Sequence, residues 1–342
     1  MINIKSLIRP NILELQPYSS AKDEFSGSDA IFLDANENPY GNLNRYPDPY
    51  QNELKQIIAN QKNINLNSIF VGNGSDELID LAFRIFCQPG IDRALTFSPT
   101  YGMYDISANI NDISLIKLPL TAEFQIDLKA VVPYLDDRSI KLIIICSPNN
   151  PTGNSMNQKD IEFILNNFKG IVLLDEAYID FSGSSSLLGL IEKYNNLIVI
   201  QTLSKAKGLA AARVGLAFTN PEIISFYNKV KPPYNVSTLN QRAAITALNN
   251  ERECDKYIQV ILEEKEQLKM ALLQLDLVKK IYPSDTNFLL VEVTDADGVY
   301  QKLVNQKIII RNRTNQVANC IRITIGTPQE NGILIKALKD YA

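Results

Sequence analysis

Residues Asn196–Thr219, NLIVIQTLSKAKGLAAARVGLAFT, contain two apolar runs separated by a polar, glycine-containing stretch. The runs Asn196–Thr202 and Val214–Thr219 are typical of buried strands, because they are short, rich in branched residues and bounded by polar ones. Open α/β sheets bind their ligands beyond the ends of their strands. The stretch therefore predicts an open sheet with Lys205 near its ligand-binding edge. Lys207 follows two residues later, and the local pattern leaves open which lysine has a chemical role.

Strand-like and helix-like segments alternate from about residue 69 to residue 230. Apolar runs such as SIFVG, RALTFS and KLIIICS each precede a stretch with helical spacing. This alternation predicts an α/β fold whose central sheet is mainly parallel and covered by helices. Residues 237–275 are typical of a long connecting helix, and a strand-helix-strand-strand-helix pattern follows them. We expect a large domain over residues 31–240 and a small α+β domain formed by residues 1–30 and 241–342.

Composition excludes several classes of protein. The 342 residues are 45% hydrophobic and 21% charged, enough for a sizeable core in two domains. The net charge of −4 is spread along the chain and predicts neither a nucleic-acid nor a membrane partner. Because no signal-like or membrane-spanning apolar run is found, we expect a cytoplasmic protein. The absence of histidine excludes Ser-His and Cys-His nucleophile pairs, and no metal site is expected. Four widely spaced cysteines predict reduced core thiols.

Two motifs after predicted strands have the chemistry of ligand-binding turns. Val71–Asp80, VGNGSDELID, passes through two glycines to Ser75 and Asp76 at a helix start, where free N–H groups and the helix dipole favour a phosphate. A plain helix cap at Ser75 explains this pattern equally well. In Cys146–Gly153, CSPNNPTG, proline and glycine shape a turn that projects the Asn150 amide from the sheet edge.

A third motif places an acid at a strand end. Ile171–Phe181, IVLLDEAYIDF, carries Asp175 where an ionised carboxylate needs a cationic partner. An acid at a strand end is also found in nucleotide hydrolases, but these need in addition a phosphate loop ending in Gly-Lys. No glycine of this chain precedes a lysine, and this class of enzyme is therefore excluded. Residues 34–54 are rich in proline and asparagine and are expected to form a functional loop.

These motifs together supply a lysine, an acid for a ring nitrogen, an amide and a phenol for a ring oxygen, and a phosphate cradle, which are the requirements of pyridoxal 5'-phosphate chemistry. The chain also resembles the histidinol-phosphate aminotransferases, a branch of the fold-type-I aminotransferases, over about residues 18–326. The resemblance rests on LDANENPYG, RYPDP, GNGSDELI, FSPTYGMY, SPNNPTG, LLDEAY, TLSKA and CIRITIG.

The resemblance implies a role for each matching residue. Lys205 binds the cofactor covalently and is catalytic, together with Asp175 at the pyridinium nitrogen and Tyr178 near the phenolic oxygen. The backbone cradle, a serine and an arginine hold the cofactor phosphate, and one tyrosine stacks on the ring. The implied cofactor-binding residues are Gly74, Ser75, Asp76, Tyr101, Asn150, Asp175, Tyr178, Ser204, Lys205, Arg213 and Tyr46. Lys207 stands where relatives usually have an aromatic residue, and we expect it on the rim.

The implied substrates and partners follow from the same resemblance. Arg322 matches the family's carboxylate-binding arginine, and Arg311 matches a second family arginine. The implied substrate-binding residues are Tyr18, Tyr46, Asn150, Arg311 and Arg322. Tyr46 reaches the neighbouring subunit's cofactor in the family, which implies a homodimer with shared sites. The expected reaction converts histidinol phosphate and 2-oxoglutarate to imidazole acetol phosphate and glutamate, in histidine biosynthesis. An aromatic or broad-specificity aminotransferase and a phosphothreonine decarboxylase of the same fold stay open as alternatives.

Overall fold

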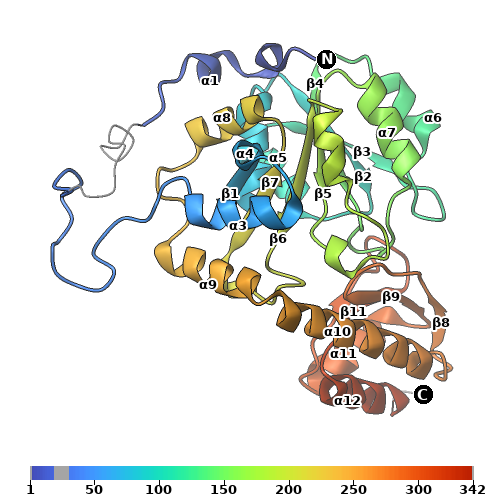
Figure 1. The fold of residues 1–342 in the computed structure, drawn as a ribbon. Coiled ribbons are helices and arrows are strands. Elements are labelled where there is room, and N and C mark those ends of the chain that lie inside the picture. The colour runs from blue at the N-terminus through green and yellow to red at the C-terminus, as the bar shows by residue number, and fades with distance from the viewer. Residues whose placement is uncertain (1, 19–30, 341–342) are drawn as a thin grey trace.

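The computed structural model describes residues 2–18 and 31–340 and has two sheets (Figure 1). The larger sheet has the order β1-β7-β6-β5-β4-β2-β3. Its strands are β1 Ile69–Asn73, β2 Arg93–Ser98, β3 Ser114–Pro119, β4 Ile140–Cys146, β5 Ile171–Asp175, β6 Leu197–Thr202 and β7 Val214–Phe218. Strands β2 to β6 pair in parallel, whereas β7 is antiparallel to both β6 and β1. The predicted mainly parallel sheet is confirmed.

Helices cover both faces of this sheet because its central strands are apolar on both sides. In β4, Leu142 and Ile144 face one core, and Ile143 and Ile145 face the other. The first core includes α4 Ser75–Phe86, α5 Met103–Ile110 and α8 Pro221–Val230, and the second includes α3 Asn52–Lys62, α6 Leu128–Val131, α7 Gln158–Asn167 and α9 Thr238–Asn249. All four cysteines are free and buried, as predicted.

The N-terminal segment packs on the large sheet, which corrects the expectation that residues 1–30 belong to the small domain. Ile4, Ile8 and Ile12, spaced by four residues around α1 Pro10–Glu14, are buried in the core that contains α4 and α8. The Arg9 N–H also donates to the Ile85 carbonyl at 3.0 Å. The apolar stripe of this segment therefore packs on the large domain. Residues 19–30 lie outside the described residues.

Two helices, not one, join the large sheet to the small one. Helix α9 contacts α3 and β7, and α10 Glu251–Leu272 follows after a break at Asn250. The backbone of Asn250 leaves the helical region, and its amide donates to the Glu253 carboxylate at 2.9 Å. Asparagine favours such breaks because its side chain competes for local hydrogen bonds. None of the helices in the described residues is long and apolar enough to cross a membrane.

The small domain has the predicted α+β form. Its antiparallel sheet has the order β10-β11-β9-β8 and packs against α10 (Figure 1). The elements are β8 Val278–Ile281, β9 Phe288–Val293, α11 Ala296–Asn305, β10 Arg311–Asn312, β11 Cys320–Thr324 and α12 Pro328–Lys339. The predicted order is confirmed for the last five of these, and β8 is an added edge strand. Of the loop predicted over residues 34–54, residues 34–51 form no helix or strand, whereas residues 52–54 begin α3.

Candidate active site

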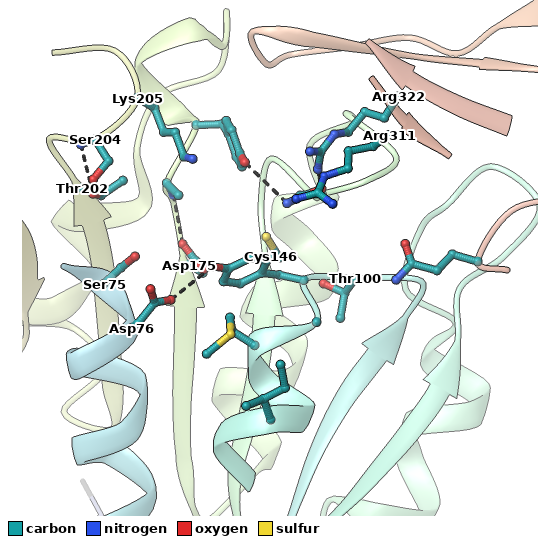
Figure 2. A pocket seen from close by; sticks show the side chains of 18 of the residues that line it. Ser75, Asp76, Thr100, Cys146, Asp175, Thr202, Ser204, Lys205, Arg311 and Arg322 are labelled. Atoms are coloured by element: carbon teal, nitrogen blue, oxygen red, sulfur yellow. Dashed lines mark hydrogen bonds between the residues drawn. The ribbon is translucent and has the colours of Figure 1, made fainter. Parts of the chain in front are cut away.

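A cleft of about 390 Å³ lies between the carboxyl ends of the central strands and the small domain (Figure 2). Figure 2 shows Ser75 and Asp76 at the start of α4, Asp175 at the end of β5, and Arg311 and Arg322 reaching in from the small domain. The predicted residues that line the cleft are Ser75, Asp76, Tyr101, Asn150, Asp175, Tyr178, Ser204, Lys205, Arg213, Arg311 and Arg322. Tertiary structure thus gathers most of the implied site in one place.

Asp175 forms the floor of the cleft. One carboxylate oxygen accepts a hydrogen bond from the Tyr104 hydroxyl at 2.7 Å, and the other accepts from the Ala177 N–H at 3.0 Å. Burial raises the pKa of Asp175 to about 6, although both hydrogen bonds oppose this rise. A carboxylate with these properties is poised to bind a cation, because a positive charge restores its ionised form. Tyr104 was not predicted; its signal was its position in the motif FSPTYGMY, three residues after Tyr101 and in the first turn of α5.

The raised pKa of Asp175 predicts a pH-dependent stability of the cofactor-free protein. Because the folded pKa lies above the unfolded one, Asp175 destabilises the fold progressively as pH rises from about 4 to about 6. At pH 8 we expect the free energy of unfolding of Asp175→Asn, measured by urea denaturation, to exceed that of the wild type by about 1–3 kcal/mol. At pH 4 the two proteins should differ little. Equal stability at pH 8 would contradict a costly buried carboxylate.

The cradle at the start of α4 has the shape of a phosphate site. Gly74 has φ +80° and precedes the helix, and no side chain caps the first N–H groups. A Cβ on Gly215 of β7 would lie 2.5 Å from the Ser75 nitrogen, so only glycine permits this approach. The Arg213 guanidinium lies over Gly74 and 3.3 Å from the Asp76 carboxylate. Ser75 is the first residue of the helix and does not cap it, so the plain-cap interpretation is wrong.

Lys205, not Lys207, enters the cleft. The Lys205 amine lies 5.7 Å from the centre of the Tyr178 ring. Burial, and then the charge of Arg322, lower the pKa of Lys205, which favours the free amine. Lys207 does not line the cleft. Its charge acts instead near Lys62, whose pKa is lowered by burial and further by Lys207.

A polar bridge connects the two domains above Asp175. The Asn150 amide donates to the Tyr178 hydroxyl at 3.4 Å, and its oxygen accepts from the Arg322 guanidinium. Arg322 lies 5.1 Å above the Phe288 ring, against which Tyr178 packs edge-on at 5.3 Å. Arg322 is therefore held beside the residues of the large domain.

Three predicted residues do not line this cleft. Gly74 lies beneath the Arg213 guanidinium, directly before Ser75. The Tyr18 side chain is 69% exposed. Tyr46 stacks on Tyr234 with ring centres 4.4 Å apart, beside a separate surface hollow. Conversely, Arg313 lines the cleft and was not predicted. The signal for Arg313 was its spacing of two residues from Arg311, which places both on one face of a strand.

Comparison with known proteins identifies the family. Residues 24–338 match the family described as aminotransferase class I and II. The chain belongs to this family. Over 99% of both chains, it is 49% identical to the histidinol-phosphate aminotransferase of Parabacteroides distasonis. These matches confirm the resemblance that the motifs indicate. The protein is an aminotransferase.

Solved structures of such aminotransferases have the same fold. The histidinol-phosphate aminotransferase of Clostridium acetobutylicum superimposes with a TM-score of 0.80 at 26% identity, covering 87% of this chain and 91% of that one. The enzyme of the same name from Sinorhizobium meliloti, in complex with pyridoxal-5'-phosphate, gives a TM-score of 0.79 at 22% identity, covering 86% and 82%. The predicted fold-type-I architecture is confirmed.

Proposed function

We propose that this aminotransferase transfers the amino group of histidinol phosphate to 2-oxoglutarate, yielding imidazole acetol phosphate and glutamate, with pyridoxal 5'-phosphate as cofactor. The observation that carries the proposal is the convergence of Lys205, Asp175 and two arginines in one cleft. The arginines come from the opposite domain and face the lysine (Figure 2). The name of the relative at 49% identity supports the same substrate.

The residues present fit pyridoxal 5'-phosphate. The uncapped start of α4, the close approach of Gly215 and the Arg213 guanidinium provide donors and room for the phosphate. Ser204 lies beside them, with its hydroxyl 3.0 Å from that of Thr202. Asp175 would hold the ring nitrogen, and Tyr101 lies at the cleft wall for stacking. When bound, the cofactor withdraws electrons from the bond that breaks at the substrate's Cα.

The protein's own groups move the proton and bind the anions. As a free amine, Lys205 takes a proton from Cα of the amino donor. In the second half-reaction it gives a proton to Cα of the amino acceptor. Asn150 and Tyr178, which share a hydrogen bond, would hold the cofactor's ring oxygen. Arg322, which its contact with Asn150 holds in the cleft, would bind the anion beside Cα.

The two arginines predict different substitution effects. Losing a charge-assisted contact lowers binding by about 1.5–3 kcal/mol. We expect Arg311→Ala to weaken the binding of histidinol phosphate more than that of glutamate, because Arg311, paired with Arg322 across the ladder, adds a second cation for the more highly charged anion. Arg322→Ala should weaken the binding of both donors, since Arg322 also holds Asn150. The measurement is kcat/KM for each amino donor. An equal effect of Arg311→Ala on both donors would favour a broad-specificity aminotransferase.

A direct assay tests the proposed reaction. Purified protein with glutamate and imidazole acetol phosphate should turn over faster than with aromatic oxo acids. Faster turnover of aromatic oxo acids would favour the aromatic aminotransferase, and release of carbon dioxide from phosphothreonine would favour the decarboxylase. Use of unphosphorylated histidinol at a rate like that of the phosphate would contradict a phosphate pocket.

We further propose a homodimer in which residues 31–47 reach a second copy. This segment runs away from the large sheet (Figure 1). Ile31 and Leu33 are each 88% exposed and Tyr40 is 84% exposed, an apolar surface that a partner would cover. Tyr46 lies outside its own chain's cleft, which agrees with a role beside the partner's cofactor. Sedimentation at micromolar concentration should give twice the monomer mass.

A further inference from the structure

Arg313 joins Arg311 and Arg322 on one face of the small sheet. Arg311 pairs directly with Arg322 across the antiparallel ladder, so their side chains share a face. Arg313 lies two residues beyond Arg311, and its N–H donates to the Cys320 carbonyl at 2.8 Å, which continues the ladder. Alternate residues of an extended strand face the same side. All three guanidinium groups accordingly line the cleft that contains Lys205.

These three arginines, the arginine triplet, have no acidic partner in the protein. Among residues 2–18 and 31–340, none of the three forms an ion pair with a carboxylate. The Nε atoms of Arg313 and Arg322 are buried and find no hydrogen-bond partner within the same residues. Burial, followed by the charges of Arg322 and Arg311, lowers the pKa of Arg313. Desolvated cations that repel each other are stabilised when an anion binds among them.

The members of the triplet are held in different ways. Arg322 donates to Asn150 and lies over Phe288, so part of its donor capacity is already used. Arg313 extends from a fixed turn, because its carbonyl accepts the N–H groups of Gln316 and Val317, each at 2.8 Å. Among the residues that the structure describes, the Arg313 guanidinium donates no hydrogen bond to Asn150, and it is left for a ligand.

We propose that Arg313 acts with Arg311 to let this cleft distinguish a phosphate monoester from a carboxylate. The inference rests on the proposed function, in that the phosphorylated substrate enters this cleft. A phosphate monoester has three terminal oxygens and a charge of about −1.5 to −2 at neutral pH. A carboxylate has two oxygens and one charge. The paired donors of Arg322 suffice for the two oxygens of a carboxylate, whereas the third oxygen and the additional charge of a phosphate are bound by Arg313 together with Arg311.

Competition by simple anions tests the role of Arg313 without histidinol phosphate. Phenyl phosphate and benzoate, which share a ring and differ in the anion, are each measured as inhibitors of the cofactor-loaded protein acting on glutamate. The wild type should bind phenyl phosphate more tightly than benzoate. Arg313→Gln should weaken phenyl phosphate by about tenfold or more and benzoate by less than about twofold. Arg313→Lys, which keeps the charge but loses the planar pair of donors, should fall between.

Lys279→Gln provides the matched control, because it removes an exposed cation of β8 outside the cleft. This variant should leave both inhibition constants unchanged. Thermal unfolding and the absorbance of bound cofactor establish that each variant is folded and loaded. An equal loss of affinity for both inhibitors in Arg313→Gln, or no loss of affinity for either, would overturn the inference. If phosphate discrimination depends on Arg313 but the wild type does not use histidinol phosphate, the anion site stands and the proposed substrate is wrong.

Discussion

Replacing Lys205 with alanine should lower transamination by about 10⁴-fold, because the amine placed to move the Cα proton is lost. Lys205 is the one lysine among the residues that line the cleft in the described part of the chain. Its lowered pKa supplies the free amine that proton transfer needs. The measurement is the rate of each half-reaction, together with the visible absorbance of bound cofactor, which should lose its pH dependence.

Lys207→Ala is the matched control for this experiment. It removes an amine two residues away that does not line the cleft. Activity and cofactor absorbance should stay within about twofold of the wild type, as for surface substitutions away from special features. An inactive Lys207→Ala beside an active Lys205→Ala would reverse the assignment of the two lysines.

Replacing Asp175 with asparagine should slow proton abstraction by about a thousandfold while cofactor still binds. The amide keeps the shape of the carboxylate and can still pair with Tyr104. It lacks the negative charge that would keep the cofactor's ring nitrogen protonated, and so the electrons left at Cα find a poorer acceptor. The single-turnover rate with glutamate measures this step, and the exchange of a deuterium at Cα isolates it.

The same substitution has opposite effects on stability and on activity. Without cofactor, burial of the Asp175 carboxylate destabilises the fold above about pH 6, and asparagine removes that penalty. A protein that keeps such a carboxylate gains a partner for a cation at the cost of stability. Near-normal turnover of Asp175→Asn would assign Asp175 a structural role only.

Local pattern was sufficient for the elements and for the chemistry that follows individual strands. β4, β5 and β6 are continuous apolar runs, and such runs can be satisfied only in a sheet covered on both faces. Asp175 is the last residue of β5, and Lys205 follows shortly after the end of β6, so their placement at one edge follows from parallel pairing. The small domain was predictable for the same reason, since Ile321 and Ile323 alternate with Arg322 in β11.

Long-range partners were not predictable from these local patterns. The isoleucine stripe of residues 4–12 indicates a buried face, and both domains offer apolar surfaces that would bury it; tertiary packing placed it on the large sheet. The break at Asn250 was likewise missed because asparagine is tolerated in helices as well as between them.

The sequence by itself determined which groups stand at strand ends and helix starts, because those positions depend on neighbours along the chain. Only the tertiary structure decided that Tyr104 supports Asp175, that Lys207 stays out of the cleft, and that Arg313 enters it. These three outcomes depend on contacts between segments far apart in sequence. The free energy of such contacts comes from burial and charge in the folded protein, and a pattern of neighbouring residues contains no information on which distant group completes them.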